Sequence, residues 1–375
     1  MGPRVVALAN FYGPTSGGLR TTLDELGRGF RRRGIERILI VPGPRSVVAE
    51  DDTGVRYEVA ARWQLGGYRI ITDRGAVVDL LEWLAPDSIE VSDKLTLAWA
   101  GRWAARRGVP AVLLSHERID AILASRVPPG FPLRRTADVW NRRLLGGYDE
   151  VVCASGFARE EFDRIGAAPS RVVPLGVDLE TFRPAGTPGR RTGPLEVLCV
   201  GRLSREKAPE LALQALAPLA RVGLDARLTF AGDGPLRSQL ERAASGQAVA
   251  FTGHVSNRSR VAELMGAADV VLAPCPAETF GLAVLEALAC GTPVVTAGRG
   301  AARELVGGDC GRAAAPGPEG MAAAVAALLA VPEARRRRAA RTRAEQFPWD
   351  RTVEGILAAH RRAGADLATA GARAA

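Results

Sequence analysis

The sequence has very little lysine, few histidines and cysteines, and no long apolar run. Its five cysteines show no metal-ligand spacing and are odd in number, so we expect reduced, mostly buried thiols in the cytoplasm. Its three histidines lie far apart along the chain and indicate no zinc site. No apolar run approaches a membrane span, and the first residues lack the apolar core of a signal peptide. These absences argue against a disulfide scaffold, a zinc protein and a membrane-spanning protein.

The net charge of +9 comes almost entirely from arginine. Only Lys94 and Lys207 are lysines among the 50 basic residues. A genome-wide codon bias is the simplest explanation, and attraction to an anionic membrane surface or to phosphate ligands is the functional one. Nucleic acid is not expected as a partner, because the chain has no basic–aromatic module and no zinc-knuckle pattern.

Short apolar runs alternate with helical patterns in two series, which is typical of parallel α/β sheets. A stretch rich in Pro and Gly separates the two series at residues 184–194 and has the composition of a linker. The first series of predicted strands covers residues 5–10, 36–42, 88–93, 111–116, 149–155 and 171–178. The second covers residues 195–201, 226–232, 248–253, 269–274 and 292–297. Among the helices between these strands, one continuous helix is predicted over 208–222.

This pattern predicts two Rossmann-like α/β domains that face each other across a cleft. The expected boundaries are 1–183 for the first domain and 184–345 for the second, with a last helix over 346–364 and a disordered tail over 365–375. In such sheets a ligand binds at the carboxyl ends of the strands. We therefore expect the functional residues in the segments that follow the strands.

The segment from Ala277 to Thr292 carries the clearest chemical pattern. Glu278 and Glu286 are eight residues apart, so on one continuous helix their carboxylates would be about 12 Å apart and could face one side. The first N–H groups of a helix that starts near Gly281 have no partner inside it and form an anion site. Two hydroxyl-binding ends around a phosphate site fit the shape of a sugar nucleotide.

Cations are also expected at this cleft. Arg202 and Lys207 follow the first strand of the second domain, where two positive charges can neutralise a diphosphate. A lysine in a chain that otherwise uses arginine indicates a need for a compact point charge. No Asp-x-Asp motif or other carboxylate cluster is present that would hold a magnesium–diphosphate pair, so we expect no metal and no cofactor.

Three features of the first domain are weaker signals by themselves. Gly17 and Gly18 lie in an expected loop before a helix, where backbone N–H groups can approach a phosphate. His116 ends a predicted strand and would face the cleft. The helix after the glycines carries Arg28 and Arg31–Arg33, which form either a solvated face or a membrane-facing patch. His360 is expected to be a solvated residue of the last helix.

Taken together, these motifs resemble the family-four retaining glycosyltransferases of the GT-B fold. The resemblance covers most of the chain, and its central element is the E-x7-E motif of that family within ETFGLAVLEALACGTPVV. The matching segments are Gly17-Gly18, His116, 175–184, 201–207, 231–235, 251–256 and 278–295. In this family the last helix crosses back to the N-terminal domain, as the end of this chain is expected to do.

The resemblance implies a role for each site residue. Glu278 would hold hydroxyls of the donor sugar, Glu286 would hold the ribose, and Arg202 and Lys207 would neutralise the diphosphate. His116 would contact the transferred sugar, and Gly17 and Gly18 would close over the diphosphate. The further expected donor contacts are Val255, Thr279, Phe280, Gly281 and Leu282. Ala208 departs from the family pattern, which has glycine after the lysine.

The expected reaction is a metal-independent, retaining transfer of a hexose to a hydroxyl acceptor, in which the leaving diphosphate helps to deprotonate the acceptor on the same face. The donor segment looks like that of actinobacterial GDP-mannose-dependent mannosyltransferases, including those that act on phosphatidylinositol. A UDP- or dTDP-sugar donor remains an alternative. The acceptor can be a lipid, a glycan or a small molecule, and its site is expected in the N-terminal domain, whose loops over 44–75 and 118–136 match no motif that we can assign.

Two other classes of protein remain open. A GT-B nucleotide-sugar epimerase would isomerise the donor without an acceptor. A non-catalytic basic protein that binds nucleic acid or lipid would have no affinity for a sugar nucleotide. For a lipid acceptor the enzyme would work at the inner face of the cell membrane, in peripheral contact with anionic lipid.

Overall fold

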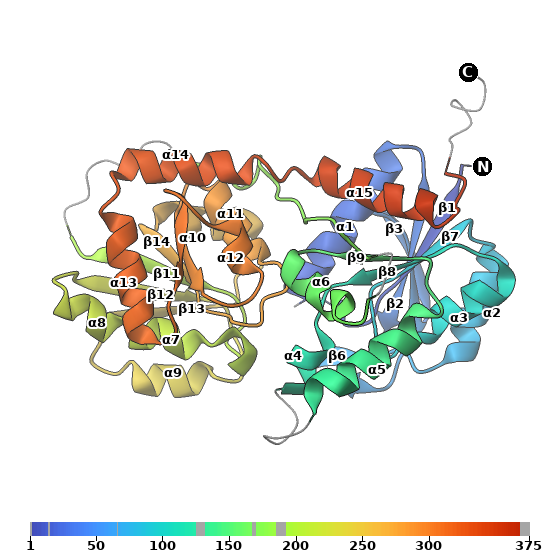
Figure 1. Ribbon diagram of the computed structural model, residues 1–375, viewed down its shortest axis with the longest axis horizontal. Coiled ribbons are helices and arrows are strands. Elements are labelled where there is room, and N and C mark those ends of the chain that lie inside the picture. Colours follow the sequence, from blue (N-terminus) through green and yellow to red (C-terminus); the bar gives the residue numbers. More distant parts are fainter. Residues whose placement is uncertain are drawn as a thin grey trace. The chain divides into compact units, whose positions relative to one another are not determined.

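The computed structural model describes residues 2–13, 16–65, 67–124, 132–166, 170–184 and 193–367. The chain forms two compact units, of which the first contains Met1–Leu175 and Trp349–Ala375 and the second contains Gly176–Pro348 (Figure 1). The sequence placed the boundary after residue 183, within a linker whose residues 185–192 lie outside the described residues. The chain returns to the first unit with helix α15 (Trp349–Arg362).

The first unit is built on an eight-stranded sheet in the order β10-β9-β8-β7-β1-β2-β4-β3. All neighbouring strands are parallel except β3 and β4. The strands are β1 (Arg4–Leu8), β2 (Glu36–Gly43), β3 (Val47–Asp51), β4 (Gly54–Ala60), β7 (Ser88–Val91), β8 (Ala111–Ser115), β9 (Glu150–Cys153) and β10 (Ser170–Val172). Because β1 lies between β2 and β7, the loops that follow β1 and β7 meet at the point where the strand order reverses.

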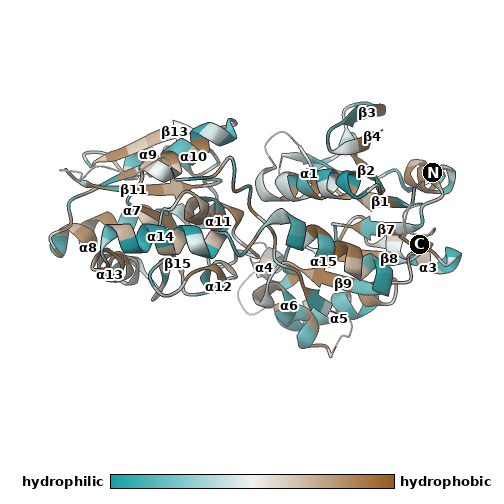
Figure 2. Ribbon diagram, turned by 90° about the horizontal axis from the view of Figure 1, so that it is seen from above, coloured by the Kyte–Doolittle hydropathy of each residue, from teal (hydrophilic) through white to brown (hydrophobic). Residues whose placement is uncertain are grey.

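Helices cover both faces of this sheet, as its apolar strands require. The central strands are buried on both sides, and Figure 2 shows them as hydrophobic ribbons among helices with mixed faces. The helices of the unit are α1 (Gly17–Arg32), α2 (Arg74–Leu84), α3 (Trp99–Arg107), α4 (Ile119–Ala124), α5 (Leu133–Leu145), α6 (Gly156–Asp163) and α15. Helix α15 packs on α1, and a side chain at Gly29 would collide with Val353 at 2.3 Å.

The second unit contains a six-stranded parallel sheet in the order β13-β12-β11-β14-β15-β16. Its strands are β11 (Leu195–Val200), β12 (Ala226–Ala231), β13 (Val249–Gly253), β14 (Val270–Ala273), β15 (Val294–Ala297) and β16 (Gly311–Ala314). Its helices are the 3₁₀ turn η1 (Arg205–Lys207), α7 (Pro209–Gln214), α8 (Leu216–Arg221), α9 (Arg237–Ala243), α10 (Arg258–Ala267), α11 (Leu282–Ala289), α12 (Ala302–Leu305), α13 (Pro318–Leu329) and α14 (Glu333–Ala344).

Several predicted elements differ from the structure. The helix predicted over 208–222 is divided into α7 and α8, because Pro218 has no N–H to donate to the preceding turn, and it begins only after Ala208, which has left-handed backbone angles. Residues 44–75, which were predicted to be a loop, contain the β3–β4 hairpin and a second hairpin of β5 (Gln64–Leu65) and β6 (Tyr68–Arg69). Residues 118–136 contain α4 and the start of α5, while 125–131 lie outside the described residues.

The chain end after α15 is more ordered than predicted. Ala365 and Leu367 are buried in the apolar cluster beneath α15, so the prediction of a disordered tail from residue 365 is wrong at these positions. Residues 368–375 of that predicted tail lie outside the described residues. The prediction for His360 is also wrong, because its side chain is fully buried and its Nδ1 lies 2.7 Å from Ser88 Oγ.

The arginines in the second half of α1, and Arg33 directly after it, form ion pairs with carboxylates of their own unit. Arg28 pairs with Asp52 at 2.6 Å and Arg33 pairs with Glu354 at 2.7 Å. Arg31 and Arg32 make longer pairs with Glu50 and Asp350, at 3.4 and 3.6 Å. These contacts fit the solvated helix face, and they reduce the charge that a membrane-facing patch would offer.

Candidate functional site

Two of the charged residues of the predicted diphosphate and sugar site meet in the second unit. Strand β11 lies between β12 and β14, so the strand order reverses between β11 and β14. Lys207 ends the 3₁₀ turn in the segment after β11, and Glu278 lies in the segment after β14. Their side chains form an ion pair with a distance of 2.6 Å between Lys207 Nζ and Glu278 Oε2. The topology therefore brings together two residues that are 71 positions apart.

Lys207 remains a cation in this setting. Burial alone would lower its pKa, but the Glu278 carboxylate, with smaller contributions from Cys275 and Glu206, raises the pKa well above its ordinary value. The Lys207 side chain keeps partial access to solvent, with 37% of it exposed against 22% for Glu278. A diphosphate could therefore reach Lys207 and compete with Glu278 for it.

The turn that presents Lys207 depends on an unusual backbone conformation. Ala208 has φ 49° and ψ 46°, which is the left-handed region, and its N–H donates to the Arg205 carbonyl at 3.1 Å. This explains why the family pattern has glycine at this position. The turn forms with alanine all the same, at a cost of about 1–2 kcal/mol for an L residue.

Helix α11 begins at Leu282, later than a continuous helix from Glu278 to Glu286 would require. Gly281 stands before it with φ 103°, and the side chain of Phe280 is buried at 4% exposure. Glu278 consequently lies in the loop before the helix, so the spacing of about 12 Å expected on one helix does not apply. Its backbone is fixed by the Ala301 N–H, which donates to the Glu278 carbonyl at 2.7 Å. Gly281 and Leu282 lie at the start of α11, so the anion site expected from their N–H groups stays a prediction.

Glu286 lies on α11 in a half-buried and partly charged environment. Burial raises its pKa to about 7, Asp178 adds to this rise, and Arg258 opposes it. Arg258 Nη1 in turn lies 3.8 Å from Asp178 Oδ2. The sequence did not single out Asp178 or Arg258, although Asp178 belongs to the segment 175–184 that matched the family.

The other predicted donor contacts of this unit lie in segments at the carboxyl ends of strands. Arg202 is exposed directly after β11, where Gly201 has φ 140°. Thr279 is half-buried between Glu278 and the start of α11. Val255 is half-buried in the segment after β13.

The remaining predicted residues belong to the first unit. Gly17 and Gly18 are the first two residues of α1 and not part of the loop before it, so their N–H groups are free helix-terminal donors. His116 follows β8 as predicted. Burial, together with the nearby cations Lys94 and Arg37, lowers the pKa of His116 to about 4 against the opposing effect of Glu90. The imidazole is therefore neutral at physiological pH.

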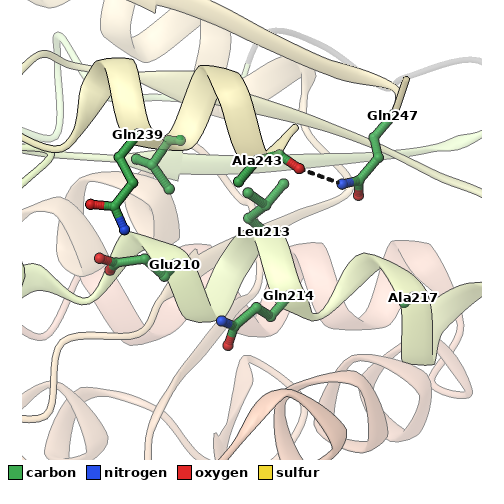
Figure 3. Close-up of a pocket in the computed structure, with 8 residues that line it drawn as sticks. Glu210, Leu213, Gln214, Ala217, Gln239, Ala243 and Gln247 are labelled. Carbon is green, nitrogen blue, oxygen red and sulfur yellow. Dashed lines mark hydrogen bonds between the residues drawn. The ribbon is translucent and has the colours of Figure 1, made fainter. Parts of the chain in front are cut away.

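A cavity of about 360 Å³ lies elsewhere on the second unit, among α7, α8 and α9 (Figure 3). Its walls combine leucine and alanine side chains with one carboxylate and three amides, from Glu210, Leu213, Gln214, Ala217, Gln239, Leu240, Ala243 and Gln247. Gln247 Nε2 is turned to the Ala243 carbonyl at 3.0 Å. None of the predicted site residues lines this cavity.

All five cysteines are free and buried, which confirms the predicted burial of these thiols. In the described parts of the chain, no three His, Cys, Asp or Glu side chains gather as metal ligands would. No helix within the same ranges has the length and apolarity needed to cross a membrane.

Comparison with known proteins decides the family. Residues 16–181 match the family model "Glycosyltransferase Family 4", and residues 194–331 match "Glycosyl transferases group 1". A GDP-mannose-dependent alpha-(1-6)-phosphatidylinositol dimannoside mannosyltransferase of Mycobacterium tuberculosis is 49% identical over 364 residues, which cover 95% of each chain. The chain is a family-four glycosyltransferase. A D-inositol 3-phosphate glycosyltransferase of Geodermatophilus obscurus is 32% identical and covers 84% of this glycosyltransferase and 71% of its own length.

The fold of this glycosyltransferase is GT-B, as the resemblance implied. Sucrose-phosphate synthase from Thermosynechococcus elongatus superposes with a TM-score of 0.79 over 96% of this chain and 98% of its own, at 20% identity. The enzyme is a hexosyltransferase, and a nucleotide-sugar donor and a hydroxyl acceptor are its substrates in general terms. An epimerase and a non-catalytic binding protein are not supported by any of these comparisons.

Proposed function

We propose that this glycosyltransferase transfers a mannosyl group from GDP-mannose to a hydroxyl of an inositol-containing mannolipid, with retention of configuration. The 49% identity to a relative whose name specifies this donor and a phosphatidylinositol dimannoside acceptor supports both choices. The observation that carries the proposal is the 2.6 Å pair of Lys207 and Glu278 beside the free N-terminus of α11. This arrangement offers a cation, a carboxylate and backbone N–H groups to one sugar diphosphate.

Donor binding would exchange the partners of Lys207. The diphosphate takes the ammonium group, with Arg202 and the N–H groups at Gly281 and Leu282 as further donors. Glu278 is then released to accept hydrogen bonds from hydroxyls of the mannose. Glu286, whose pKa is raised to about 7, exists in both protonation states near neutral pH, so it can donate to a ribose oxygen or accept from a ribose hydroxyl.

We propose a front-face reaction for the transfer. The bond between the anomeric carbon and the β-phosphate oxygen breaks, and GDP leaves with the electron pair. The acceptor oxygen bonds to the anomeric carbon on the same face, and its proton passes to the departing phosphate oxygen. Lys207 and Arg202 would stabilise the charge that develops on the diphosphate, so the chemistry assigned to these residues needs no metal ion. Neutral His116 would contact the transferred sugar.

A lipid acceptor implies contact with a membrane surface, and we propose that this contact involves Trp63, Arg45 and Arg62. Trp63 is 71% exposed, and both arginines are exposed and form no ion pair with any residue that the structure describes. The Ala61 N–H donates to the Gly43 carbonyl at 2.9 Å, which holds this segment at the carboxyl ends of β2 and β4. A tryptophan beside free cations suits an anionic lipid interface. Such an enzyme would act at the inner face of the cell membrane.

An assay with radiolabelled donor tests the proposal. Protein is incubated with GDP-mannose or UDP-glucose, with and without vesicles that contain phosphatidylinositol mannosides, and the lipid products are separated. We expect labelled lipid only from GDP-mannose with these vesicles. Transfer from UDP-glucose alone would contradict the proposed donor, and isomerised donor without acceptor would mean an epimerase.

A further inference from the structure

Lys94 is one of only two lysines in the chain, and like Lys207 it forms a close pair with a glutamate. It follows β7 in the first unit, and its Nζ donates to Glu161 Oε2 on α6 at 2.9 Å. The pair is deeply buried, with 4% of the Lys94 side chain and none of the Glu161 side chain exposed. The ammonium group also lies 5.2 Å from the centre of the Phe162 ring. A compact ammonium fits this space, whereas a planar guanidinium is larger.

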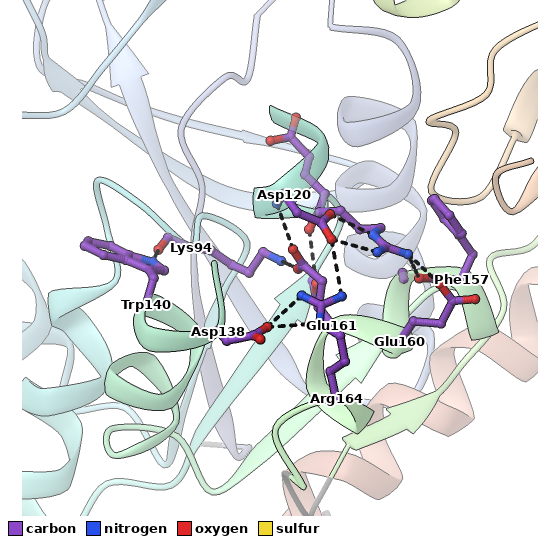
Figure 4. A network of polar contacts seen from close by, with 12 residues as sticks. Lys94, Asp120, Asp138, Trp140, Phe157, Glu160, Glu161 and Arg164 are labelled. Carbon is purple, nitrogen blue, oxygen red and sulfur yellow. Dashed lines mark hydrogen bonds and ion pairs between the residues drawn. The ribbon is translucent and has the colours of Figure 1, made fainter. Parts of the chain in front are cut away.

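The second oxygen of Glu161 holds the start of helix α4. Glu161 Oε1 accepts from the Asp120 N–H at 3.0 Å, and this N–H in the first turn of α4 has no partner inside the helix. The Glu161 carboxylate therefore joins the lysine after β7 to the helix that follows β8. Figure 4 shows Lys94 and Asp120 approaching Glu161 from different elements.

Arg118 forms a second set of hydrogen bonds between the segment after β8 and helix α6. Its Nε and Nη2 donate to the two carboxylate oxygens of Asp120 at 2.9 and 2.8 Å. Its Nη1 donates to the Phe157 carbonyl at 2.8 Å and to Glu160 at 2.7 Å (Figure 4). His116 is two residues before Arg118, so both attachments act on the short segment that carries the imidazole.

The backbone of Lys94 is itself fixed. The Asp93 carboxylate accepts from the N–H groups of Leu95 and Thr96 at 2.7 and 2.9 Å. Trp140 Nε1 on α5 donates to the Lys94 carbonyl at 2.9 Å. The backbone of Lys94 is therefore fixed, and the hydrogen bond from its ammonium group orients the Glu161 carboxylate.

We infer that Lys94 and Glu161 are positioning residues, which fix the segment carrying His116 and thereby set the place of its imidazole without touching substrate. A buried ion pair is weak evidence for stability, because desolvation of two charges offsets their attraction. Through Glu161 this pair connects the loop after β7 with the segment after β8. His116 lies in that segment, so the connection restricts the position of its imidazole. The inference rests on the proposed function for its turnover readout, and on the structure alone for its spectroscopic readout.

A double-mutant cycle tests the inference by turnover. We expect Glu161→Ala to lower kcat about 10-fold through displacement of His116 and to leave the KM for the donor unchanged. In a His116→Ala background the same change should have almost no further effect, because the two residues act as one unit. Glu161→Gln, which keeps an oxygen for the Asp120 N–H, should recover most of the activity. Losses that multiply in the double variant would overturn the inference.

Titration of the histidines gives a readout that does not depend on activity. The charged groups that act on the pKa of His116 are Glu90 on β7, Lys94 after β7 and Arg37 on β2. Glu161 is not among these groups, so in Glu161→Ala, which keeps the Lys94 charge, displacement of the imidazole should shift the pKa of His116 away from about 4, as followed by NMR of labelled histidine. His254 of the second unit is the internal control and should not change.

The two readouts separate the inference from the proposed function. A wild-type protein that transfers no mannose would contradict the proposed function, and the histidine titration would still decide the role of the Lys94–Glu161 pair. An unchanged His116 titration in a folded Glu161→Ala variant would overturn the inference even in a fully active enzyme.

Discussion

Lys207 Nζ and Glu278 Oε2 lie 2.6 Å apart although the two residues belong to segments that follow different strands. Each residue is therefore the partner of the other when no donor is bound. Donor binding would replace the Lys207–Glu278 ion pair by contacts of both residues with the donor. The first prediction follows from this exchange.

Lys207→Ala is expected to lower kcat/KM by about 10²- to 10³-fold, because it removes a cation from the charge that develops on the leaving diphosphate. Steady-state kinetics with varied donor measure the loss. The matched control is Arg221→Ala, because the Arg221 side chain is 66% exposed and pairs with the exposed Glu319. Equal losses in the two variants would show that the lysine is incidental.

Glu286→Gln should change how stability depends on pH. The pKa of Glu286 is raised from 4.5 to about 7, so between these values the folded protein binds more protons at this site than the unfolded chain does. This site therefore makes the wild type lose stability as pH rises through that range, and the glutamine variant lacks the loss. In thermal unfolding from pH 4.5 to pH 7.5, the Tm of the variant should increase relative to the Tm of the wild type as the pH rises. A constant difference in Tm would contradict a raised pKa.

Ala208→Gly should stabilise the protein by up to about 1 kcal/mol, because glycine adopts the left-handed conformation without strain but loses more chain entropy on folding. Denaturant unfolding measures the gain. Ala85→Gly is the control, since Ala85 has φ 46° at the end of α2 in the first unit. Both variants should be stabilised and remain active. A destabilised Ala208→Gly variant beside a stabilised Ala85→Gly variant would mean that the turn of Lys207 is not strained.

Trp63→Ala should raise the KM for a vesicle-bound acceptor by about tenfold, equivalent to about 1.4 kcal/mol, and leave the KM for the donor unchanged. Trp83→Ala provides a closely matched comparison, because Trp83 is 70% exposed on α2 and contacts Tyr57 instead of the free arginines. A similar rise in both variants would argue against a specific role for Trp63.

The sequence predicted the strand series and the family motifs well, because buried parallel strands appear as apolar runs and the loops after them carry the chemistry. It did not predict that Glu278 lies outside the helix, because the helix start depends on Gly281 at φ 103° and on burial of Phe280. The DDTG turn between β3 and β4 was a readable hairpin signal that the prediction overlooked.

Other features arise only from tertiary contacts. Asp178 meets Arg258 and Glu286 through packing of segments far apart in the chain, and no local pattern marks such a meeting. The burial of His360 against Ser88 depends in the same way on α15 returning to the first unit. A helical pattern in the sequence does not specify the sheet on which that helix packs.

The most direct test of the central claim is donor binding to the purified protein, followed by thermal unfolding. Among GDP-mannose, UDP-glucose, dTDP-glucose and ADP-glucose, GDP-mannose at 100 times its Kd should add about 2.7 kcal/mol of stability, and Lys207→Ala should reduce this gain. The other three donors should add little at the same concentration. No stabilisation by any sugar nucleotide, or equal stabilisation of the wild type and Lys207→Ala, would contradict the assignment of this site to the donor.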